Sequence, residues 1–341
     1  MIKVLIIDDS AIVCKVLNGI LSEAEDIEVI GSASDPYEAR AMIVDHKPDV
    51  ITLDIEMPRM DGTSFLKILM KHYPIPTVMI SSLTKEGAEI TLQALELGAV
   101  DFLAKPVLSK ENIAEISLEL IDKIYAASKV DIGKISNRVQ NEGSLTLPDL
   151  FMTDKIIAIG ASIGGTNALR NLLSAMPSNS PPILVTQHMT AGFTKSFAKR
   201  LDSICKVEVR EAKMNDQLKR GVCLIAPGSG HMRLKKVAGK DVVDISDEEL
   251  ICGHRPSVEV LFESMANVAK KRGIGIMLTG MGSDGANAML AMKNNGGYNI
   301  AQDEATSLVF GMPKEAIKLG GVDQVAPLDK IGELVIKQLI G

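Results

Sequence analysis

The chain has 341 residues, of which 46% are hydrophobic and 23% are charged, as in globular proteins that bury substantial cores. Because this length exceeds the usual size of one domain, we expect two domains. The formal net charge of −6 and the pI of about 5.5 exclude a general electrostatic attraction for nucleic acid or an anionic membrane. The N-terminus shows no signal-peptide pattern, and no apolar run approaches the roughly 18 residues that span a bilayer, so we expect a soluble, cytoplasmic protein without membrane insertion.

The cysteines are scattered along the chain and show no CxxC spacing. They predict neither a disulfide framework nor a zinc site. Each is expected to be a small buried apolar residue, which suits a reducing cytoplasm. They are Cys14, Cys205, Cys223 and Cys252.

The chain up to about residue 125 alternates short apolar runs with amphipathic stretches. The apolar runs are predicted strands: residues 3–8, 27–33, 49–54, 76–81 and 100–104. Between the first two, apolar residues recur at helical spacing over residues 12–21. This alternation predicts an α/β domain with a doubly wound parallel sheet of five strands.

Acidic residues stand at the ends of two of these predicted strands. Asp8 and Asp9 end the first strand, and Asp54 ends the third. Their convergence at one edge of the sheet would be repulsive, and a divalent cation such as Mg²⁺ relieves that repulsion through oxygen ligands. Ser81 and Lys105 end the fourth and fifth strands and offer a hydroxyl and an ammonium to a phosphoryl group at the same edge. The alternative is that Asp9 or its neighbour simply caps the helix that follows.

A polar stretch rich in Ser, Asn, Asp and Gly separates this domain from a second α/β pattern. We predict a first domain at 1–122, a linker at 123–152 and a second doubly wound domain at 153–341. The second domain's predicted strands are 155–160, 183–187, 222–226, 273–280 and 298–301, with a β-rich excursion around 204–246 and a helix over 257–271 that Ser257 caps.

Ser162 and His188 each follow a predicted buried strand of the second domain. The carboxyl ends of parallel strands are where ligands and chemistry are found, so a nucleophile and a base at two such ends indicate a hydrolytic site. Residues 160–164, GASIG, match the G-x-S-x-G pattern of a nucleophile elbow. Two alternatives stay open: Ser162 as a helix cap, and a dinucleotide phosphate loop. The loop is disfavoured because G-x-G-x-x-G is absent and no acid ends the next strand.

A serine hydrolase also needs an acid that orients the histidine. Asp284 lies in a glycine-rich turn after a third predicted strand, although an aspartate there could equally cap a helix. His231 and His254 are competing histidines, each with a structural loop role as its alternative. The order Ser, His, Asp along the chain differs from the Ser, Asp, His order of α/β-hydrolases, so that fold is not assumed.

The first domain resembles the receiver domain of two-component response regulators. The resemblance rests on VLIIDDS (4–10), LDIEMPRMDG (53–62), VMISS (78–82) and DFLAKP (101–106). It implies that a histidine kinase phosphorylates Asp54 and that Ser81 and Lys105 contact the phosphate. The implied Mg²⁺ ligands are Asp8, Asp9, Asp54 and the carbonyl of Glu56.

The whole chain is similar to the chemotaxis protein-glutamate methylesterase family. The segments that carry this resemblance are TQHM (186–189), IAPG (225–228), HRPSV (254–258), LTGMG (278–282) and VFGMP (309–313), together with residues 159–165. The resemblance implies that Ser162 is the nucleophile, His188 the base, Asp284 its orienting acid and the Met281 amide an oxyanion donor, with no cofactor for the esterase. Position 163 departs from the family, because it is Ile where relatives commonly have Thr.

The expected function is therefore phosphorylation-activated hydrolysis of glutamate methyl esters on the cytoplasmic helices of methyl-accepting chemoreceptors, with release of methanol. The same site would deamidate glutamine, because only the leaving group differs. The resemblance implies that the unphosphorylated receiver restricts access to Ser162 and that phosphorylation relieves the restriction. The alternative is a second domain that only binds DNA or a partner. Beyond residue 150 the sequence shows no helix-turn-helix pattern, basic stripe or zinc spacing, which argues against DNA.

Overall fold

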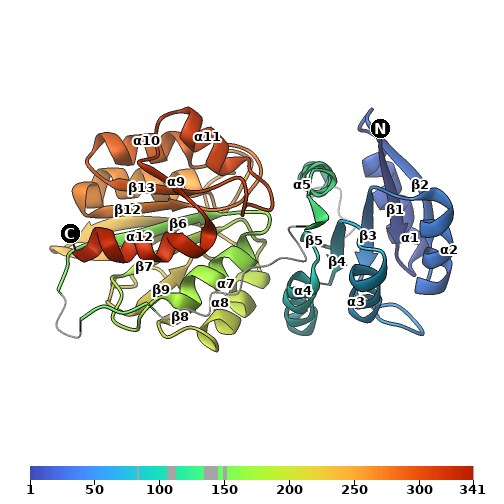
Figure 1. Ribbon diagram of the computed structural model, residues 1–341, viewed down its shortest axis with the longest axis horizontal. Helices are drawn as coiled ribbons and strands as arrows, with labels where there is room; N and C mark the ends of the chain where they lie inside the picture. Colours follow the sequence, from blue (N-terminus) through green and yellow to red (C-terminus); the bar gives the residue numbers. More distant parts are fainter. Residues whose placement is uncertain (83, 106–112, 134–144, 149–151, 341) are drawn as a thin grey trace. The chain divides into compact units, whose positions relative to one another are not determined.

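The computed structural model describes residues 1–82, 84–105, 113–133, 145–148 and 152–340, with side chains omitted at 113–115 (Figure 1). The chain divides into two compact units, Met1–Asn137 and Arg138–Gly341, and each unit is described by itself. The predicted end of the first domain at residue 122 falls within helix α5, Ile113–Ser128. Of the predicted linker, residues 134–144 and 149–151 lie outside the described residues, and the domain boundaries stay predictions.

The first unit is built on a parallel five-stranded sheet in the order β2-β1-β3-β4-β5. Its strands are β1 Ile2–Ile7, β2 Ile27–Ala33, β3 Val50–Asp54, β4 Thr77–Ser81 and β5 Asp101–Ala104. Its other helices are α1 Ala11–Leu21, α2 Pro36–His46, α3 Gly62–His72 and α4 Lys85–Leu97. The side chains of β3 and β4 are buried throughout, as expected for central strands covered on both faces. The predicted doubly wound sheet is confirmed.

Polar residues begin the helices of this unit at the carboxyl ends of the strands. The side chains of Ser10, Asp35, Asp61 and Thr84 each accept a hydrogen bond from a backbone N–H in the first turn of α1, α2, α3 and α4. Ser10, rather than Asp8 or Asp9, therefore caps α1. This leaves both carboxylates at the edge of the sheet for other interactions.

The second unit contains a parallel sheet of seven strands, in the order β14-β13-β12-β6-β7-β9-β8. The strands are β6 Ile156–Ala161, β7 Ile183–Gln187, β8 Glu208–Glu211, β9 Val222–Ile225, β12 Gly273–Met277, β13 Tyr298–Gln302 and β14 Gln324–Ala326. The helices are α7 Gly165–Ala175, α8 Phe193–Asp202, α9 Val258–Ser264, α10 Ala286–Asn294, α11 Met312–Lys318 and α12 Leu328–Ile340. Helix α7 packs against α8 and α12, whereas α10 packs against α9 and α11, so two helical layers enclose the sheet (Figure 1). This second α/β fold was also predicted.

The β-rich excursion predicted around 204–246 is present, whereas one predicted helix differs in detail. The excursion contains β8 and β9 of the main sheet and a separate antiparallel hairpin, β10 His231–Val237 with β11 Lys240–Ser246. The helix predicted over 257–271 is α-helical only at Val258–Ser264 and continues as a π-helix at Met265–Ala269 and a short 3₁₀ turn at Lys270–Arg272. An apolar spacing identifies a helical face but does not distinguish α from π hydrogen bonding.

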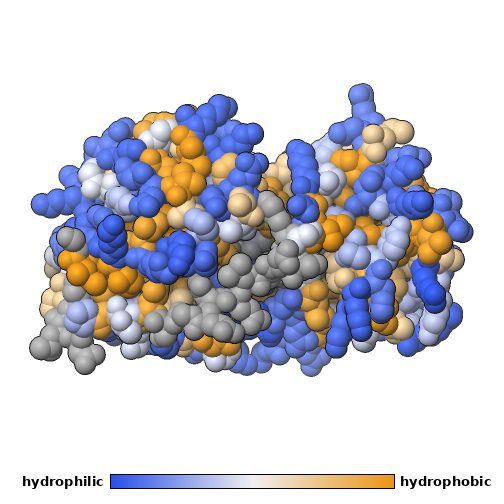
Figure 2. Space-filling model, viewed as in Figure 1, coloured by the Kyte–Doolittle hydropathy of each residue, from blue (hydrophilic) through white to orange (hydrophobic). Residues whose placement is uncertain are grey.

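Polar and charged side chains cover much of the visible surface, with apolar patches between them (Figure 2). Large exposed apolar side chains such as Ile12, Leu118 and Val237 lie on separate elements rather than in one sequence block. Within the described parts of the chain, no helix is both long and apolar enough to cross a membrane.

Candidate active site

Three adjacent strands of the second sheet end at the predicted catalytic residues. Ser162 follows β6, His188 follows β7, and Asp284 lies in the loop after β12. Strand β6 lies between β12 and β7, and the chain runs from β6 toward β7 before it returns to β12 on the other side. Such a reversal of strand order opens a crevice at the carboxyl ends of the strands, which is where α/β sheets bind ligands.

Ser162 lies in a tight turn between β6 and α7. Its amide donates to the Thr279 carbonyl at 3.0 Å, and its carbonyl accepts from Gln187 Nε2 at 2.9 Å. The left-handed conformation of this turn is at Gly164, with φ of 77°. At Gly165 a Cβ atom would come within 2.2 Å of Gln187 Oε1 and 2.7 Å of Ala161 Cβ, so a larger residue there would displace the Gln187 amide that holds the serine turn. The turn fixes the serine between two neighbouring strands.

The imidazole of His188 connects the serine and the aspartate. Its Nδ1 lies 3.1 Å from Ser162 Oγ, and its Nε2 lies 2.6 Å from Asp284 Oδ2. Because an ionised carboxylate only accepts hydrogen bonds, the proton of a neutral His188 belongs on Nε2, which leaves Nδ1 free to accept from the serine hydroxyl. In the chymotrypsin triad, Nε2 faces the serine and Nδ1 faces the aspartate, whereas here the two nitrogens are exchanged. The roles of serine, histidine and aspartate stay the same.

Asp284 is 2% exposed and accepts four hydrogen bonds. Besides His188, the donors are Ser257 Oγ at 2.7 Å, the Val258 amide at 2.6 Å and the Glu259 amide at 3.0 Å. The two amides begin helix α9, so Asp284 caps a helix that is distant in sequence rather than the one that follows it. Burial raises the pKa of Asp284, but hydrogen bonds and charge attraction from His188, together with the Ser257 and Val258 donors, outweigh it and lower the pKa to about 2.

The segment after β12 approaches the serine closely. A Cβ atom at Gly280 would come within 2.7 Å of Ser162 Cβ, and the Gly280 carbonyl accepts from the amides of Gly311 and Met312. Met281, the predicted oxyanion donor, is the next residue. Among the described residues no acceptor is recorded for its amide, which leaves that N–H available to a developing oxyanion. Its role stays a prediction.

Ile163, where the resemblance led us to expect Thr, is 5% exposed. Thr279 Oγ1 lies 2.9 Å from the Ile163 carbonyl and 3.1 Å from the Val309 carbonyl, so the one hydroxyl proton is shared between these two acceptors. Thr279 thus links the serine turn to the 309 segment through its side chain. The buried Ile163 side chain brings no polar atom to the site.

The two competing histidines have different environments. His231 is fully buried, with Nε2 2.9 Å from the Glu249 carbonyl and Nδ1 accepting from the Ser257 amide at 3.2 Å, so its role is structural. The ring of His254 stacks on that of His188. Sequence reasoning assigned Ser257 to capping α9, but its side chain makes no capping bond there and donates to Asp284 instead.

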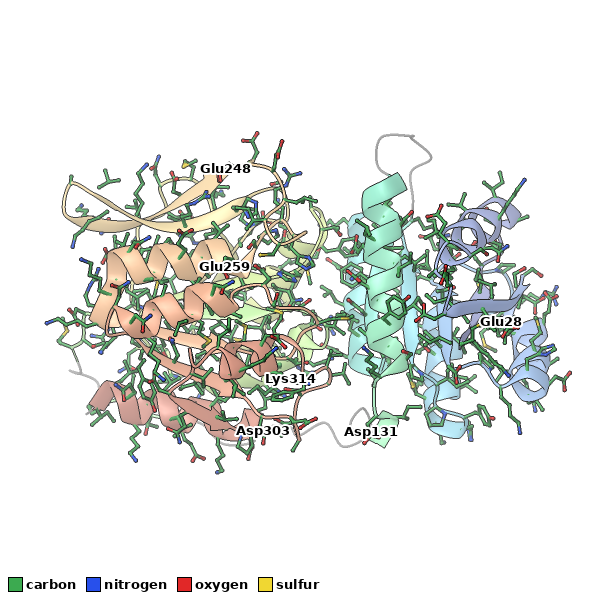
Figure 3. The ribbon with its side chains drawn as sticks, turned by 90° about the horizontal axis from the view of Figure 1, so that it is seen from above. Glu28, Asp131, Glu248, Glu259, Asp303 and Lys314 are labelled. Carbon is green, nitrogen blue, oxygen red and sulfur yellow. The ribbon has the colours of Figure 1, made fainter. Side chains whose placement is uncertain are left out.

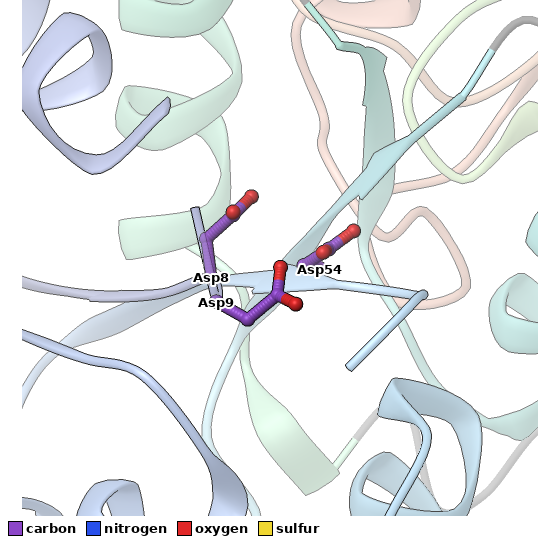
Figure 4. Close-up of side chains that lie close together, drawn as sticks. All are labelled: Asp8, Asp9 and Asp54. Carbon is purple, nitrogen blue, oxygen red and sulfur yellow. The ribbon is translucent and has the colours of Figure 1, made fainter. Parts of the chain in front are cut away.

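The receiver unit has its own polar cluster at the carboxyl ends of its strands. Carboxylate oxygens of Asp8, Asp9 and Asp54 all lie within 4.8 Å of one another (Figure 4). Lys105 Nζ lies 2.8 Å from Asp54 Oδ2 and 3.8 Å from Asp8 Oδ2. Four of the residues predicted from strand ends are therefore brought together.

These carboxylates are poorly compensated without a cation. Burial raises the pKa of Asp54 to about 6, despite the opposing hydrogen bond from Lys105, and burial also raises the pKa of Asp8. Asp8 Oδ2 is buried without a hydrogen-bond partner among the described residues. An all-oxygen donor set with such an unsatisfied atom fits a hard divalent cation such as Mg²⁺.

The remaining predicted receiver residues lie around this cluster. The Glu56 amide donates to Asp54 Oδ1 at 3.3 Å, and its carboxylate accepts from Ser82 Oγ at 3.1 Å. Among the described residues, the Ser81 hydroxyl makes no hydrogen bond with Asp54. It accepts from Thr91 Oγ1 of α4 at 2.6 Å and donates toward the Gly87 carbonyl at 3.3 Å. Sequence reasoning did not identify Thr91.

Comparisons with known proteins identify a family for each of the two α/β segments of the chain. Residues 157–335 match the CheB methylesterase family, and residues 4–117 match the response regulator receiver domain. A protein of Syntrophus aciditrophicus, named protein-glutamate methylesterase/protein-glutamine glutaminase 2, is 50% identical over 341 residues that cover 99% of each chain. The chain belongs to the CheB methylesterase family.

Other relatives of the CheB family support the same assignment. The protein-glutamate methylesterase/protein-glutamine glutaminase of Methylobacillus flagellatus is 50% identical, over 99% of this chain and 97% of that one. The crystal structure of the Thermotoga maritima CheB methylesterase catalytic domain is similar with a TM-score of 0.53 and 41% identity, and it covers 55% of this chain and 100% of that one. The chain is thus a CheB-family hydrolase with a receiver domain, and the sequence-based family prediction is confirmed.

Proposed function

We propose that this CheB-family enzyme hydrolyses glutamate methyl esters on the cytoplasmic helices of methyl-accepting chemoreceptors, by a Ser162–His188–Asp284 triad. The observation that carries the proposal is the continuous contact from Ser162 Oγ through both nitrogens of His188 to a buried, ionised Asp284. A binding domain would have no need of this arrangement. The names of the relatives support the substrate class.

In the first half of the reaction, Ser162 Oγ attacks the ester carbonyl while its proton passes to His188 Nδ1. The tetrahedral intermediate collapses when the bond to the methoxy group breaks, and His188 returns the proton to the leaving group, which departs as methanol. The glutamyl group remains esterified to Ser162. The Met281 amide would donate to the oxyanion of the intermediate.

In the second half, water attacks the acyl-enzyme and gives a proton to His188 Nδ1. Collapse of the new intermediate returns that proton to Ser162 Oγ and releases the glutamate side chain. A glutamine side chain would form the same acyl-enzyme with release of ammonia, which explains how one site serves as methylesterase and glutaminase. Asp284 stays ionised throughout and stabilises the imidazolium.

The receiver supplies the control step. A chemotaxis histidine kinase is the proposed phosphodonor, Asp54 the acceptor, and Ser81 and Lys105 the groups that contact the phosphate. Asp8, Asp9, Asp54 and the Glu56 carbonyl would hold Mg²⁺, which neutralises charge around the phosphoryl group when bound. Phosphorylation then favours an arrangement in which substrate reaches Ser162. We place the receiver at 1–122, the linker at 123–152 and the catalytic domain at 153–341, in the cytoplasm.

The test is methanol release from methylated chemoreceptor membranes, with Ser162→Ala against Ser203→Ala, an exposed serine at the end of α8. We expect no release above background for Ser162→Ala and normal release for Ser203→Ala. A folded Ser162→Ala enzyme with normal release would refute the triad. Acetyl phosphate should accelerate the wild type and leave Asp54→Asn unchanged, and equal acceleration of both would refute control through Asp54.

A further inference from the structure

The imidazole of His188 has a covered face as well as two occupied nitrogens. The ring of His254 stacks on it with the ring centroids 3.7 Å apart and the planes inclined by 20°. The His188 side chain is only 8% exposed. The hydrogen bonds to Ser162 and Asp284 restrain His188 in the plane of its ring. The stacked His254 restrains movement out of that plane.

His254 is held in place by a tight turn. The backbone groups of Ile251 and His254 exchange two hydrogen bonds, of 3.1 and 3.0 Å. The two residues between them, Cys252 and Gly253, have positive φ of 54° and 79°, as a type I′ turn requires. Next in the chain, Arg255 Nη1 donates to the carbonyls of Asp247 and Glu248 at 3.1 and 3.0 Å. The backbone is therefore held by hydrogen bonds at His254 itself and at the next residue, Arg255.

The same segment also reaches the acid of the triad. Ser257 Oγ and the Val258 amide donate to Asp284. Five residues of continuous chain, 254–258, thus contact His188 through a ring and Asp284 through hydrogen bonds. Any displacement of this segment would alter both partners together.

We propose that His254 is a positioning residue for His188, and that its flat ring, rather than either of its nitrogens, carries this role. The proposal rests on the triad proposed above. Nδ1 of His188 must meet the serine hydroxyl and then the leaving group, and an error of about 1 Å in such a position costs up to about 100-fold in rate. His188 is also cationic in the transition state, and a π face against it stabilises that charge.

The test compares three variants of His254 in the full chain, activated with acetyl phosphate. His254→Ala removes the ring, His254→Leu fills the space without a π face, and His254→Phe keeps a flat ring without a nitrogen. We expect kcat for methanol release to fall on the order of 10- to 100-fold for Ala, with KM little changed, and to be largely restored by Phe. Leu should resemble Ala, and should the Ala variant fail to fold, the contrast of Leu with Phe decides the question.

Proton NMR spectroscopy reports on the hydrogen bond between His188 and Asp284. The proton between His188 Nε2 and Asp284 gives a low-field proton NMR signal when it is protected from exchange. We expect this signal in the wild type and in His254→Phe, and its loss by exchange broadening in His254→Ala. A structural role without effect on the ring of His188 would leave the signal unchanged in all variants that fold.

The outcomes separate the two proposals. A normal kcat in His254→Ala would overturn the stacking role. A kcat of His254→Phe as low as that of His254→Ala would also overturn it, and would assign the role to a nitrogen of His254 instead. If Ser162→Ala retains methanol release in the same assay, the triad itself fails. His46→Ala, at an exposed histidine ending α2, is the matched control and should leave kcat unchanged.

Discussion

Asp54 and Asp284 occupy equivalent places in the two units, but their pKa values shift in opposite directions. Each is almost fully buried and lies at the carboxyl edge of a parallel sheet. Burial raises the pKa of both carboxyls. For Asp54 burial prevails and the pKa rises to about 6, whereas for Asp284 the surrounding donors prevail and the pKa falls to about 2.

The difference comes from the number of donors around each carboxylate. Asp284 receives hydrogen bonds from His188, a serine hydroxyl and two amides at the start of α9. Asp54 receives one from Lys105 and a long one from the Glu56 amide, and it lies beside Asp8. A satisfied carboxylate holds a fixed charge, which suits a triad, while an under-compensated one retains affinity for a cation and a phosphoryl group.

The pKa of the neighbouring acid Glu259 shifts in the direction opposite to that of Asp284. Glu259 lies on α9 (Figure 3), and its Oε2 is buried without a hydrogen-bond partner among the described residues. Burial raises the pKa of Glu259, with the Asp284 charge acting in the same direction. The low pKa of Asp284 therefore depends on its particular donors, and His188 is the first of them.

The largest effect should follow from removing the charge at the satisfied carboxylate. Asp284→Asn keeps the size of the side chain but removes the charge that orients His188 Nε2–H and stabilises the imidazolium. We expect kcat for methanol release to fall on the order of 1,000-fold or more. Steady-state kinetics measure this decrease in kcat. Asp45→Asn, at an exposed aspartate of α2, is the control. A decrease below tenfold would show that Asp284 is dispensable for the chemistry.

The next effect concerns the under-compensated carboxylates. Chelation of divalent cations by EDTA should slow the acceleration by acetyl phosphate on the order of 100-fold, because the charges of Asp8, Asp9 and Asp54 then repel the phosphodonor. Unstimulated methanol release should not change. The rate at which activity develops after addition of acetyl phosphate, with and without Mg²⁺, measures the effect. Equal rates in both conditions would exclude a cation at this cluster.

The same contrast predicts opposite effects on stability. Asp54 has a raised pKa, so ionising it destabilises the folded state, and this cost grows as pH rises from about 4 to about 6. Asp54→Asn removes the charge and should therefore stabilise the Mg²⁺-free receiver at pH 7 by roughly 2 kcal/mol. Asp284 has a lowered pKa, so it stabilises the fold above about pH 4 and loses that contribution as pH falls toward 2. Asp284→Asn should therefore destabilise by roughly 2 kcal/mol at pH 7.

Thermal unfolding of the full chain at pH 7 and pH 4 tests both signs. The receiver transition is identified as the one that Mg²⁺ shifts upward. At pH 4 the gain from Asp54→Asn should largely vanish, because the native carboxyl is then protonated. Destabilisation by Asp54→Asn at pH 7, or stabilisation by Asp284→Asn, would contradict the comparison.

The sequence was sufficient to predict which strands carry polar side chains at their ends. Apolar runs define buried parallel strands whose carboxyl ends meet at one edge, so Ser162, His188 and Asp284 were expected at that edge, while their catalytic roles came from the resemblance to the family. The supporting contacts were not predictable in this way. The donation by Ser257 to Asp284 depends on where α9 packs, and the stacking of His254 depends on a turn with positive φ at Cys252.

The thiols show the same limit. All four cysteines were expected to be buried, but only Cys223 is, and Cys252 is exposed. Composition describes average burial, whereas Cys252 lies in a turn that positions another side chain. Burial, followed by the charges of Asp284 and Glu259, raises the pKa of this thiol to about 11, so exposure alone does not make it reactive.

The smallest predicted effect concerns Ser81, a predicted phosphate contact whose hydroxyl already has hydrogen-bond partners without a phosphoryl group. Thr91 Oγ1 lies 2.6 Å from both Ser81 Oγ and the Gly87 carbonyl, and the hydrogen bond between the two hydroxyls holds Ser81 toward α4. To contact a phosphoryl group on Asp54, Ser81 must give up this bond, which is worth about 0.5–1.5 kcal/mol net. Thr91→Val should therefore tighten binding of beryllofluoride, a phosphoryl mimic, by about 2- to 10-fold in the presence of Mg²⁺.

Thr91→Ser is the matched control for this experiment, because it retains the hydroxyl while it removes the methyl group. Calorimetric titration should give it the wild-type affinity. If Thr91→Val and Thr91→Ser tighten binding equally, the methyl group rather than the hydrogen bond to Ser81 is responsible. If Thr91→Val weakens binding, Thr91 supports the phosphorylated state instead of competing with it, and the receiver would then resemble the esterase site, where surrounding donors prepare the reactive group rather than divert it.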